Sequence, residues 1–320
     1  MTRLTPEQLA QEIADFLVFK RTLGHPYVRG ALMLRSFERF VHQQASPHSP
    51  IVLETMVNGW LSRVEGRKSV TIALELGVIR QLCRYRRRSD PHGFVPGREW
   101  APQPTTSNFL PYILSGEELH QLIDAATRHR GCNLGATMLR TLVLILYCTG
   151  LRLGEAVRLQ LHDVDLERCL FIVRESKGKT RLVPFRTDLA QVLDNYLAAR
   201  TRIARRVDDG PLLVRLSGDA LPVQVASEAI RRLLRKVGLK PVKGRVGPRP
   251  YDLRHAFAVH RLTDWYRQGL DIHARLPWLS AYMGHDNVLG TEVYLTATAE
   301  LMALASQRFE ARFWHSGGRP

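Results

Sequence analysis

Residues 283–294 read MGHDNVLGTEVY and place Tyr294 nine residues behind His285. Three cationic side chains precede this stretch in separate segments: Arg152 within CTGLRLGEA at 148–156, Lys177 within SKGKTRLVPF at 176–185, and Arg254 within YDLRH at 251–255. Two arginines, a lysine, a histidine and a tyrosine together suit breaking and rejoining a phosphodiester through a covalent phosphotyrosine.

The two arginines are predicted to hold the phosphate. Negative charge builds on its non-bridging oxygens during exchange, and the guanidinium fork of Arg152 or Arg254 matches two of those oxygens. Gly150 is expected to end a helix, which would leave Arg152 at the junction into the next helix. The alternative for each arginine is a solvated position on a helix surface. The flanking Thr-Gly-Leu-Arg and Leu-Arg-His contexts favour the phosphate role.

Tyr294 is the predicted nucleophile, and His285 is predicted to donate a hydrogen bond to the phosphate. A phenol with a pKa near 10 attacks poorly until nearby cations stabilise its anion. An isolated tyrosine is more often half-buried packing on a helix. The histidine nine residues before Tyr294 makes the chemical interpretation the stronger one.

In order and local context, these segments resemble the tyrosine recombinase, or phage integrase, family. The resemblance covers about residues 110–310 and implies a mostly α-helical protein with a small β-sheet (α+β). It implies a helical core-binding domain over residues 1–90, a linker over 91–109 and a catalytic domain over 110–320. In the family, the two domains close as a C-shaped clamp around duplex DNA.

Local patterns agree with this organisation. Leu9, Ile13 and Phe16 recur at helical spacing in the first domain, and prolines and glycines fill residues 89–107. Ser115 followed by Glu118 is a capping-box signature. Further along the chain we expect a buried helix at 138–147, strands at 169–174 and 181–185, and helices at about 188–206, 226–237, 252–268, 274–283 and 298–312.

By the resemblance, a lysine on the β-turn protonates the leaving 5′ oxygen, and Lys177 is preferred over Lys179 for this role. A lysine can act as the acid because neighbouring cations lower its pKa. The alternative is one more exposed hairpin lysine. The Gly-Lys-Thr at 178–180 also mimics the end of a phosphate-binding loop, but Val173 stands where that loop needs glycine, so ATP binding is not expected.

One position departs from the family pattern. The family commonly has His-x-x-Arg, and Tyr251 stands here at the histidine position. A tyrosine hydroxyl donates a hydrogen bond but takes a proton near pH 7 less readily than imidazole does. We interpret this as a working variant, with Tyr251 a rival nucleophile far less favoured than Tyr294. His255 is interpreted as a structural helix residue.

The charge balance indicates a polyanionic partner. The 320 residues carry 46 Lys and Arg against 30 Asp and Glu, a formal net charge of +16. Nucleic acid is the first candidate and an anionic membrane the second. No polybasic tail or lipidation signal favours a membrane, and the apolar stretch 142–148 is too short to cross one. The start has no apolar signal region, and the four cysteines lack metal-ligand spacing.

The resemblance implies double-stranded DNA as the partner, bound at a specific site by a homotetramer on two sites, with a second recombinase as an option. The chemistry would need neither cofactor nor metal, and the family's usual compartment is the cytoplasm. The predicted DNA contacts are Arg80, Arg84, Arg87, Arg88, Lys179 and Arg181.

Three functions remain open at this point. The first is a site-specific recombinase that integrates, excises or resolves DNA. The second is a DNA-binding accessory protein with impaired catalysis, which Tyr251 would suit. The third is a type IB topoisomerase, which shares the chemistry but exchanges no partners.

Overall fold

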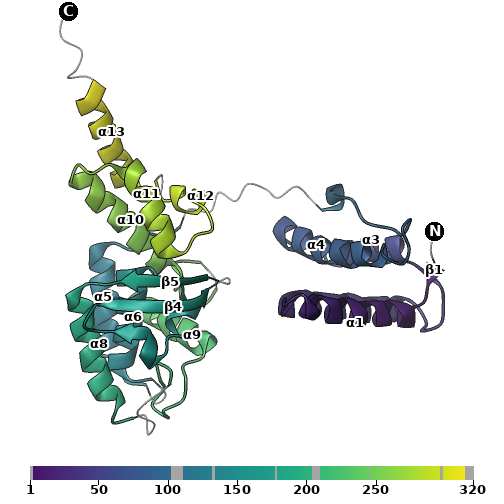
Figure 1. Cartoon of the computed structure of the whole chain (residues 1–320), viewed down its shortest axis with the longest axis horizontal. Coiled ribbons are helices and arrows are strands. Elements are labelled where there is room, and N and C mark those ends of the chain that lie inside the picture. The colour runs from purple at the N-terminus through teal and green to yellow at the C-terminus, as the bar shows by residue number, and fades with distance from the viewer. Residues whose placement is uncertain are drawn as a thin grey trace, which may run out of the picture. The chain divides into compact units, whose positions relative to one another are not determined.

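The computed structural model describes residues 3–101, 111–131, 134–176, 179–203, 210–244, 246–295 and 298–313. The chain divides into two compact units, Met1–Phe109 and Leu110–Pro320, each with its own hydrophobic core (Figure 1). None of the helices described is both long and apolar enough to span a membrane.

The first unit is built from helices. Its elements are β1 (Arg3–Leu4), α1 (Pro6–Thr22), α2 (Val28–Gln44), β2 (Ile51–Val52), α3 (Leu53–Ser62), α4 (Ser69–Arg86) and the 3₁₀ helix η1 (Arg98–Trp100). A capping box between Thr5 and Gln8 starts α1. The helices bury Phe16, Phe37 and Trp60 against one another, which confirms the expected helical character of this part.

Residues 91–101 pack on the helical core of the first unit. Phe94, Val95 and Trp100 lie against its core, and the rings of Phe94 and Trp100 are 5.4 Å apart. Arg80 donates to the carbonyl of Pro96, and Arg87 Nε donates to the carbonyl of Gly93 at 2.9 Å. These apolar side chains are too widely spaced to form a period, so the sequence pattern alone suggested only an extended linker.

The second unit contains most of the chain. Its elements are α5 (Gly116–Thr127), α6 (Ala136–Thr149), α7 (Leu153–Ala156), η2 (Leu161–Asp163), β3 (Val164–Asp165), β4 (Leu170–Ser176), β5 (Lys179–Pro184), α8 (Thr187–Arg200), α9 (Val223–Lys236), α10 (Asp252–Arg267), α11 (Ile272–Met283), α12 (Leu289–Glu292) and α13 (Ala299–Phe313). The three strands form one antiparallel sheet in the order β3-β4-β5. The mostly helical fold with a small sheet is confirmed.

Helix α6 forms the centre of this unit. Its residues Leu142, Val143 and Ile145 are fully buried, and the helix packs against α5, α8 and α10. The sequence predicted this helix from its largely apolar composition, and most of its apolar residues are buried, whereas Leu144, Tyr147 and Cys148 are partly exposed. Figure 1 shows α5, α6 and α8 together beside the sheet. The rigid end of α6 then positions the next segment.

A separate apolar cluster joins α10, α11 and the chain beyond them. Tyr294 belongs to this cluster with Phe257, Leu276 and Met283, and Leu301 of α13 closes it. Helix α13 packs on α10, where Arg267 forms an ion pair with Glu300. Burial of apolar surface therefore fixes the segment that carries Tyr294.

Candidate active site

The first part of the site is the turn that ends α6. Gly150 has φ 61° and ψ 18°, the left-handed conformation expected of a glycine C-cap, so this prediction is confirmed. A Cβ at position 150 would lie 2.4 Å from a ring carbon of Phe257. The tight turn brings Arg152 to the N-cap of α7, directly beside the end of α6.

A buried carboxylate holds Arg152 in place. Glu155 has a side chain only 1% exposed, and its Oε1 accepts from Arg152 Nη1 at 2.8 Å. Its two oxygens also accept from Arg181 Nη1 and Nη2 at 3.1 and 2.9 Å. Arg152 Nη2 donates to the carbonyl of Gly284 at 2.9 Å. One acid therefore orients two guanidinium groups, and one of these also reaches the loop that carries His285.

Arg254 is the most deeply buried cation of the site. It is 1% exposed, and it donates from Nη1 to the carbonyl of Gly150 at 2.6 Å and from Nη2 to that of Met283 at 2.7 Å. Burial, and next the charge of Arg152, lower the pKa of Arg254. These backbone contacts tie the end of α6 to the end of α11 through a single guanidinium.

His285 follows a second left-handed glycine. Gly284 ends α11 with φ 68° and ψ 47°, and a Cβ there would lie 2.8 Å from the guanidinium of Arg181. His285 Nδ1 lies 2.7 Å from Oγ1 of the buried Thr291. This hydrogen bond holds the imidazole ring of His285 in a fixed orientation.

Tyr294 is held inside the unit. It is 1% exposed, and its ring lies 5.3 Å from that of His255 and 6.4 Å from that of His285, nearly parallel to the latter. Its hydroxyl lies 3.0 Å from His255 Nδ1. Burial raises the pKa of Tyr294 to about 12, although Arg254 acts in the opposite direction. In this conformation the phenol is therefore protonated.

Tyr251 and His255 lie side by side at the start of α10. Tyr251 is 41% exposed, and its ring meets that of His255 edge-on with 4.7 Å between centroids. His255 Nε2 is 3.8 Å from Oδ1 of the buried Asp252. Burial lowers the pKa of His255 to about 4, against the opposing effect of Asp252.

Sequence reasoning missed the positions of His255 and Glu155. Neither residue shows its partners in the linear sequence, since Tyr294 lies 39 residues from His255 and Arg181 lies 26 residues from Glu155. The available signals were the Arg-x-x-Glu spacing at 152–155, which forms a capping box, and an imidazole directly after Arg254.

The remaining predicted residues differ in their surroundings. Lys177 lies outside the described residues. Lys179 is 71% exposed and lies 3.7 Å from Asp286 Oδ1. Arg181, predicted to contact DNA, is instead largely buried against Glu155 because that carboxylate lies directly beside it. Arg84 on α4 is exposed, and in the turn that follows α4 the guanidinium of Arg88 lies over the ring of Phe19.

No cluster of three or more His, Cys, Asp or Glu that could hold a metal ion occurs in the described ranges. Within those ranges, Arg152, Arg254, His285 and Tyr294 come together from separated segments of the chain. A helical unit with a small sheet, carrying two guanidinium groups around a histidine and a tyrosine, is the arrangement of a strand-transfer enzyme of the tyrosine type.

Comparison with known proteins supports the same class. The model of the phage integrase family matches residues 113–300. A putative integrase/recombinase of Sinorhizobium fredii, y4rB, is 32% identical over 310 residues, which is 95% of this chain and 97% of that protein. Tyrosine recombinase XerA of Thermococcus onnurineus is 30% identical over 251 residues, 77% of each chain.

Solved structures show the same fold. The Tn1549 transposon integrase in complex with transposon right end DNA has a TM-score of 0.67 at 16% identity and covers 97% of this chain and 100% of that one. The XerH site-specific recombinase bound to a palindromic difH substrate has a TM-score of 0.64 at 21% identity, covering 89% and 78%.

The chain therefore belongs to the phage integrase family. It is a tyrosine-type site-specific DNA recombinase, and its relatives do not favour the alternative of an accessory protein with impaired catalysis.

Proposed function

We propose that this recombinase cuts one DNA strand by attack of Tyr294 Oη on a phosphodiester and rejoins it to a partner strand. The attack would leave a 3′-phosphotyrosine and a free 5′-hydroxyl, and that hydroxyl would attack the phosphotyrosine of the partner. The observation that carries the proposal is the convergence of Arg152, Arg254, His285 and Tyr294, which come from four separated segments, around one small region.

The cations would stabilise the charge that develops on the phosphate. Arg152 is oriented by Glu155 and Arg254 by two backbone carbonyls, so neither has to reorganise when the charge appears. His285 would donate a third hydrogen bond from Nε2, since Thr291 holds the other nitrogen. Lys177 would protonate the leaving 5′ oxygen, and Tyr251 would donate a weaker hydrogen bond from the edge of the site.

Tyr294 must become accessible for this reaction. At 1% exposure the side chain is shielded, so the segment around α12 has to open enough for a phosphate to reach Oη. Leu289 and Val293 of this segment are exposed, so opening would have to break mainly the packing of Tyr294 in its apolar cluster. Burial would protect the nucleophile until DNA is bound.

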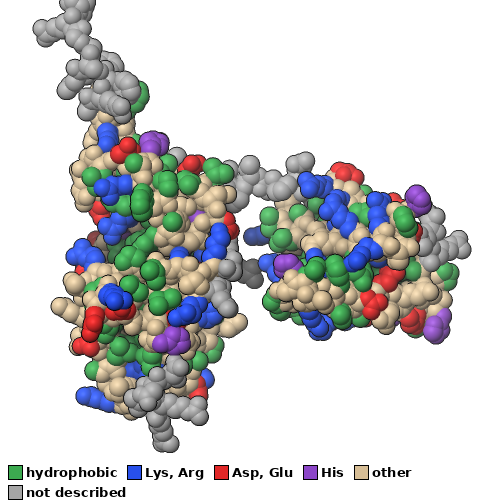
Figure 2. Space-filling model, viewed as in Figure 1, with side chains coloured by type: hydrophobic (Ala, Val, Ile, Leu, Met, Phe, Trp, Pro, Cys, Tyr) green, Lys and Arg blue, Asp and Glu red, His purple; other side chains and the backbone are tan. Residues whose placement is uncertain are grey.

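DNA binding would come largely from phosphate contacts. Figure 2 shows Lys and Arg side chains spread over the visible face of both units. The exposed Arg84, Arg88 and Lys179 are the best candidates for contacts, whereas Arg80, Arg87 and Arg181 make hydrogen bonds within the protein. Affinity should fall steeply with salt because bound phosphates release counterions. With DNA as its partner, the protein would act in the cytoplasm.

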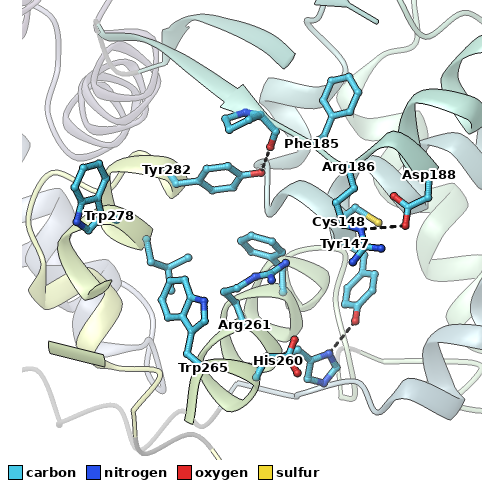
Figure 3. A pocket seen from close by; sticks show the side chains of 14 residues that line it. Tyr147, Cys148, Phe185, Arg186, Asp188, His260, Arg261, Trp265, Trp278 and Tyr282 are labelled. Atoms are coloured by element: carbon cyan, nitrogen blue, oxygen red, sulfur yellow. Dashed lines mark hydrogen bonds and ion pairs between the residues drawn. The ribbon is translucent and has the colours of Figure 1, made fainter. Parts of the chain in front are cut away.

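A homotetramer on two DNA sites would bring two cleaved strands together. A pocket of about 680 Å³ between α6, α10 and α11 is suited to receive a neighbour's α13, and Figure 3 shows Tyr282, Trp265 and Arg261 around its hollow. On α13, Leu301 packs within its own chain, while Met302 and Phe309 are 49% and 63% exposed. Trp278, 76% exposed at the rim, supplies apolar area for this contact.

Covalent trapping tests the proposed chemistry. Purified protein is mixed with nicked duplexes from the DNA that flanks its own gene, without ATP or added metal, and adducts are mapped by mass spectrometry. We expect an adduct on Tyr294, lost in Tyr294→Phe although DNA binding persists. An adduct lost in Tyr251→Phe and kept in Tyr294→Phe would show that the wrong nucleophile was chosen.

The acid is tested with a 5′-phosphorothiolate substrate, whose leaving group needs no proton. Lys177→Ala should slow cleavage of ordinary DNA far more than Lys179→Ala, and the phosphorothiolate should restore only the former. Failure to restore Lys177→Ala would remove that role from Lys177.

A further inference from the structure

We propose that His255 takes the proton of Tyr294 when the strand is cut and returns it when the strand is rejoined. This inference rests on the proposed function of Tyr294 as the nucleophile. Position 251, where the family commonly has a histidine, carries a tyrosine in this chain. The imidazole that serves the nucleophile would then come from position 255, one helical turn further along α10.

The geometry places one imidazole nitrogen on the reacting atom. Nδ1 of His255 is 3.0 Å from Oη of Tyr294, a distance at which a proton can be passed directly. The other imidazole near the nucleophile belongs to His285, and its Nδ1 is occupied by Thr291 at 2.7 Å. Tyr251 contacts His255 through the edge of its ring, so it lines the base and leaves Nδ1 to Tyr294.

The neighbours of His255 set its tautomer. Nε2 lies 3.8 Å from Oδ1 of Asp252, and a carboxylate beside this nitrogen favours a proton on it. Nδ1 is then the acceptor, and the Tyr294 hydroxyl donates to it. The charged and titratable groups around the ring are Asp252, Arg249, Arg254, Tyr251 and Tyr294.

The same surroundings would change when DNA arrives. Burial and the two arginines keep His255 neutral in the free protein, so Nδ1 is ready to accept. Asp252 acts in the opposite direction, but its carboxylate also pairs with Arg249, whose Nη2 lies 3.0 Å from Oδ1, and burial outweighs it. An incoming phosphodiester adds a negative charge close to Arg254, and a nearby negative charge favours the imidazolium. DNA binding would therefore strengthen His255 as a base at the moment it is needed.

The step balances without an outside reagent. As the bond between Oη and phosphorus forms, the phenolic proton moves to Nδ1, and the bond between phosphorus and the 5′ oxygen breaks. The 5′ oxygen takes its proton from the general acid, proposed as Lys177. In rejoining, a 5′-hydroxyl attacks phosphorus, its proton returns to the general acid, Oη leaves, and the imidazolium gives Oη its proton back.

The test uses His255→Asn in the full chain with the same nicked duplexes. Asparagine can place an acceptor oxygen near the Nδ1 position, so it keeps the hydrogen bond to Tyr294 and cannot take the proton. We expect unchanged DNA binding and single-turnover cleavage about 100-fold slower at pH 7, rising steadily with pH as hydroxide replaces the base. Replacing Tyr294 by a difluorotyrosine, which ionises near neutral pH, should restore most of the lost rate.

Folding is controlled by a matched pair on the same helix. His260 Nδ1 lies 3.0 Å from Tyr147 Oη, so His260→Asn makes the same replacement at an equivalent contact away from the nucleophile and calibrates the change in melting temperature. Should His255→Asn melt far below that control, His255→Gln serves as the second variant.

The outcomes separate the two proposals. A wild-type protein without an adduct on Tyr294 would count against the proposed function itself. Wild-type adduct together with His255 variants that cleave at the wild-type rate would overturn the role of His255. The role of His255 would also be overturned if a His255 variant cleaved slowly and difluorotyrosine at position 294 did not restore the rate, because His255 would then act only by packing.

Discussion

Replacing Glu155 by glutamine should destabilise the second unit and also remove the contact that orients the Arg152 guanidinium for the phosphate. Glu155 accepts four hydrogen bonds: from the backbone nitrogen and Nη1 of Arg152, both at 2.8 Å, and from Nη1 and Nη2 of Arg181, at 3.1 and 2.9 Å. Glutamine keeps the shape and one oxygen. Its NH₂ group would face two of these donors without an acceptor between them, and the negative charge between the guanidinium groups would be lost.

The size of the effect follows from burial. A hydrogen bond to a charged group contributes about 1.5–3 kcal/mol, and two are lost. Breaking a buried ion pair by removing one partner costs about 3–5 kcal/mol, which agrees with that sum. The relevant side chains are 1% exposed for Glu155, 14% for Arg181 and 22% for Arg152, so solvent screens them little. We expect a loss of about 3–5 kcal/mol.

The chain also offers a matched control. Glu228 contacts Arg235 Nη1 at 3.1 Å and Arg232 Nε at 3.6 Å, but its side chain is 41% exposed. Exposed ion pairs contribute about 0–1 kcal/mol, so Glu228→Gln should change stability little. Both carboxylates lie beside two arginines, but Glu155 is buried and accepts four hydrogen bonds, whereas Glu228 is partly exposed and accepts one.

Hydrogen–deuterium exchange in increasing urea measures the effect, because amides of α6 and α10 report opening of the second unit separately from the first. In the trapping assay, Glu155→Gln should also slow adduct formation by about 100-fold, the cost of about 2.7–4 kcal/mol for a lost preorganised donor. Equal stability of Glu155→Gln and Glu228→Gln would refute the reasoning from burial.

Three further predictions concern the same unit. Burial lowers the pKa of His255 to about 4, below the value near 6.5 of an unfolded histidine. Between these two pH values the unfolded chain binds a proton that the folded chain does not, so the free energy of unfolding decreases as the pH falls from about 6.5 to about 4. Urea unfolding should therefore show that the free energy of unfolding falls less steeply with decreasing pH in His255→Asn than in wild type. The same pH dependence in both proteins would contradict this. Lysine in place of Arg254 cannot reach both backbone carbonyls, so Arg254→Lys should lower the free energy of unfolding by about 2–3 kcal/mol. The variant should also lose most adduct formation while it still binds DNA in a gel-shift assay. A full adduct yield would argue against a role of Arg254 at the phosphate. In urea unfolding, Gly284→Ala should lower the free energy of unfolding by about 1–3 kcal/mol more than Gly238→Ala does. Both glycines have positive φ, but only at position 284 would a Cβ lie 2.8 Å from the Arg181 guanidinium. Equal losses would mean that Arg181 moves aside freely.

Local sequence determined the parts of the fold that depend on neighbouring residues. The capping box from Ser115 to Glu118 starts α5, and Gly150 ends α6, because both signals act within one helical turn. The largely apolar composition of α6 likewise required burial, whatever surrounds it. The order and context of Arg152, Arg254, His285 and Tyr294 were sufficient for the family and the type of chemistry.

Tertiary structure decided which groups touch. Glu155 reads as an ordinary helix residue, yet it bridges two arginines because β5 brings Arg181 beside α7. His255 reads as a structural helix residue, yet the turn after α12 brings Tyr294 to its Nδ1. Arg181 reads as a DNA contact, and the fold places its guanidinium against Glu155. The physical reason is the same in each case: charge and hydrogen bonding act over a few ångströms in space, whereas sequence patterns report only residues that are close along the chain.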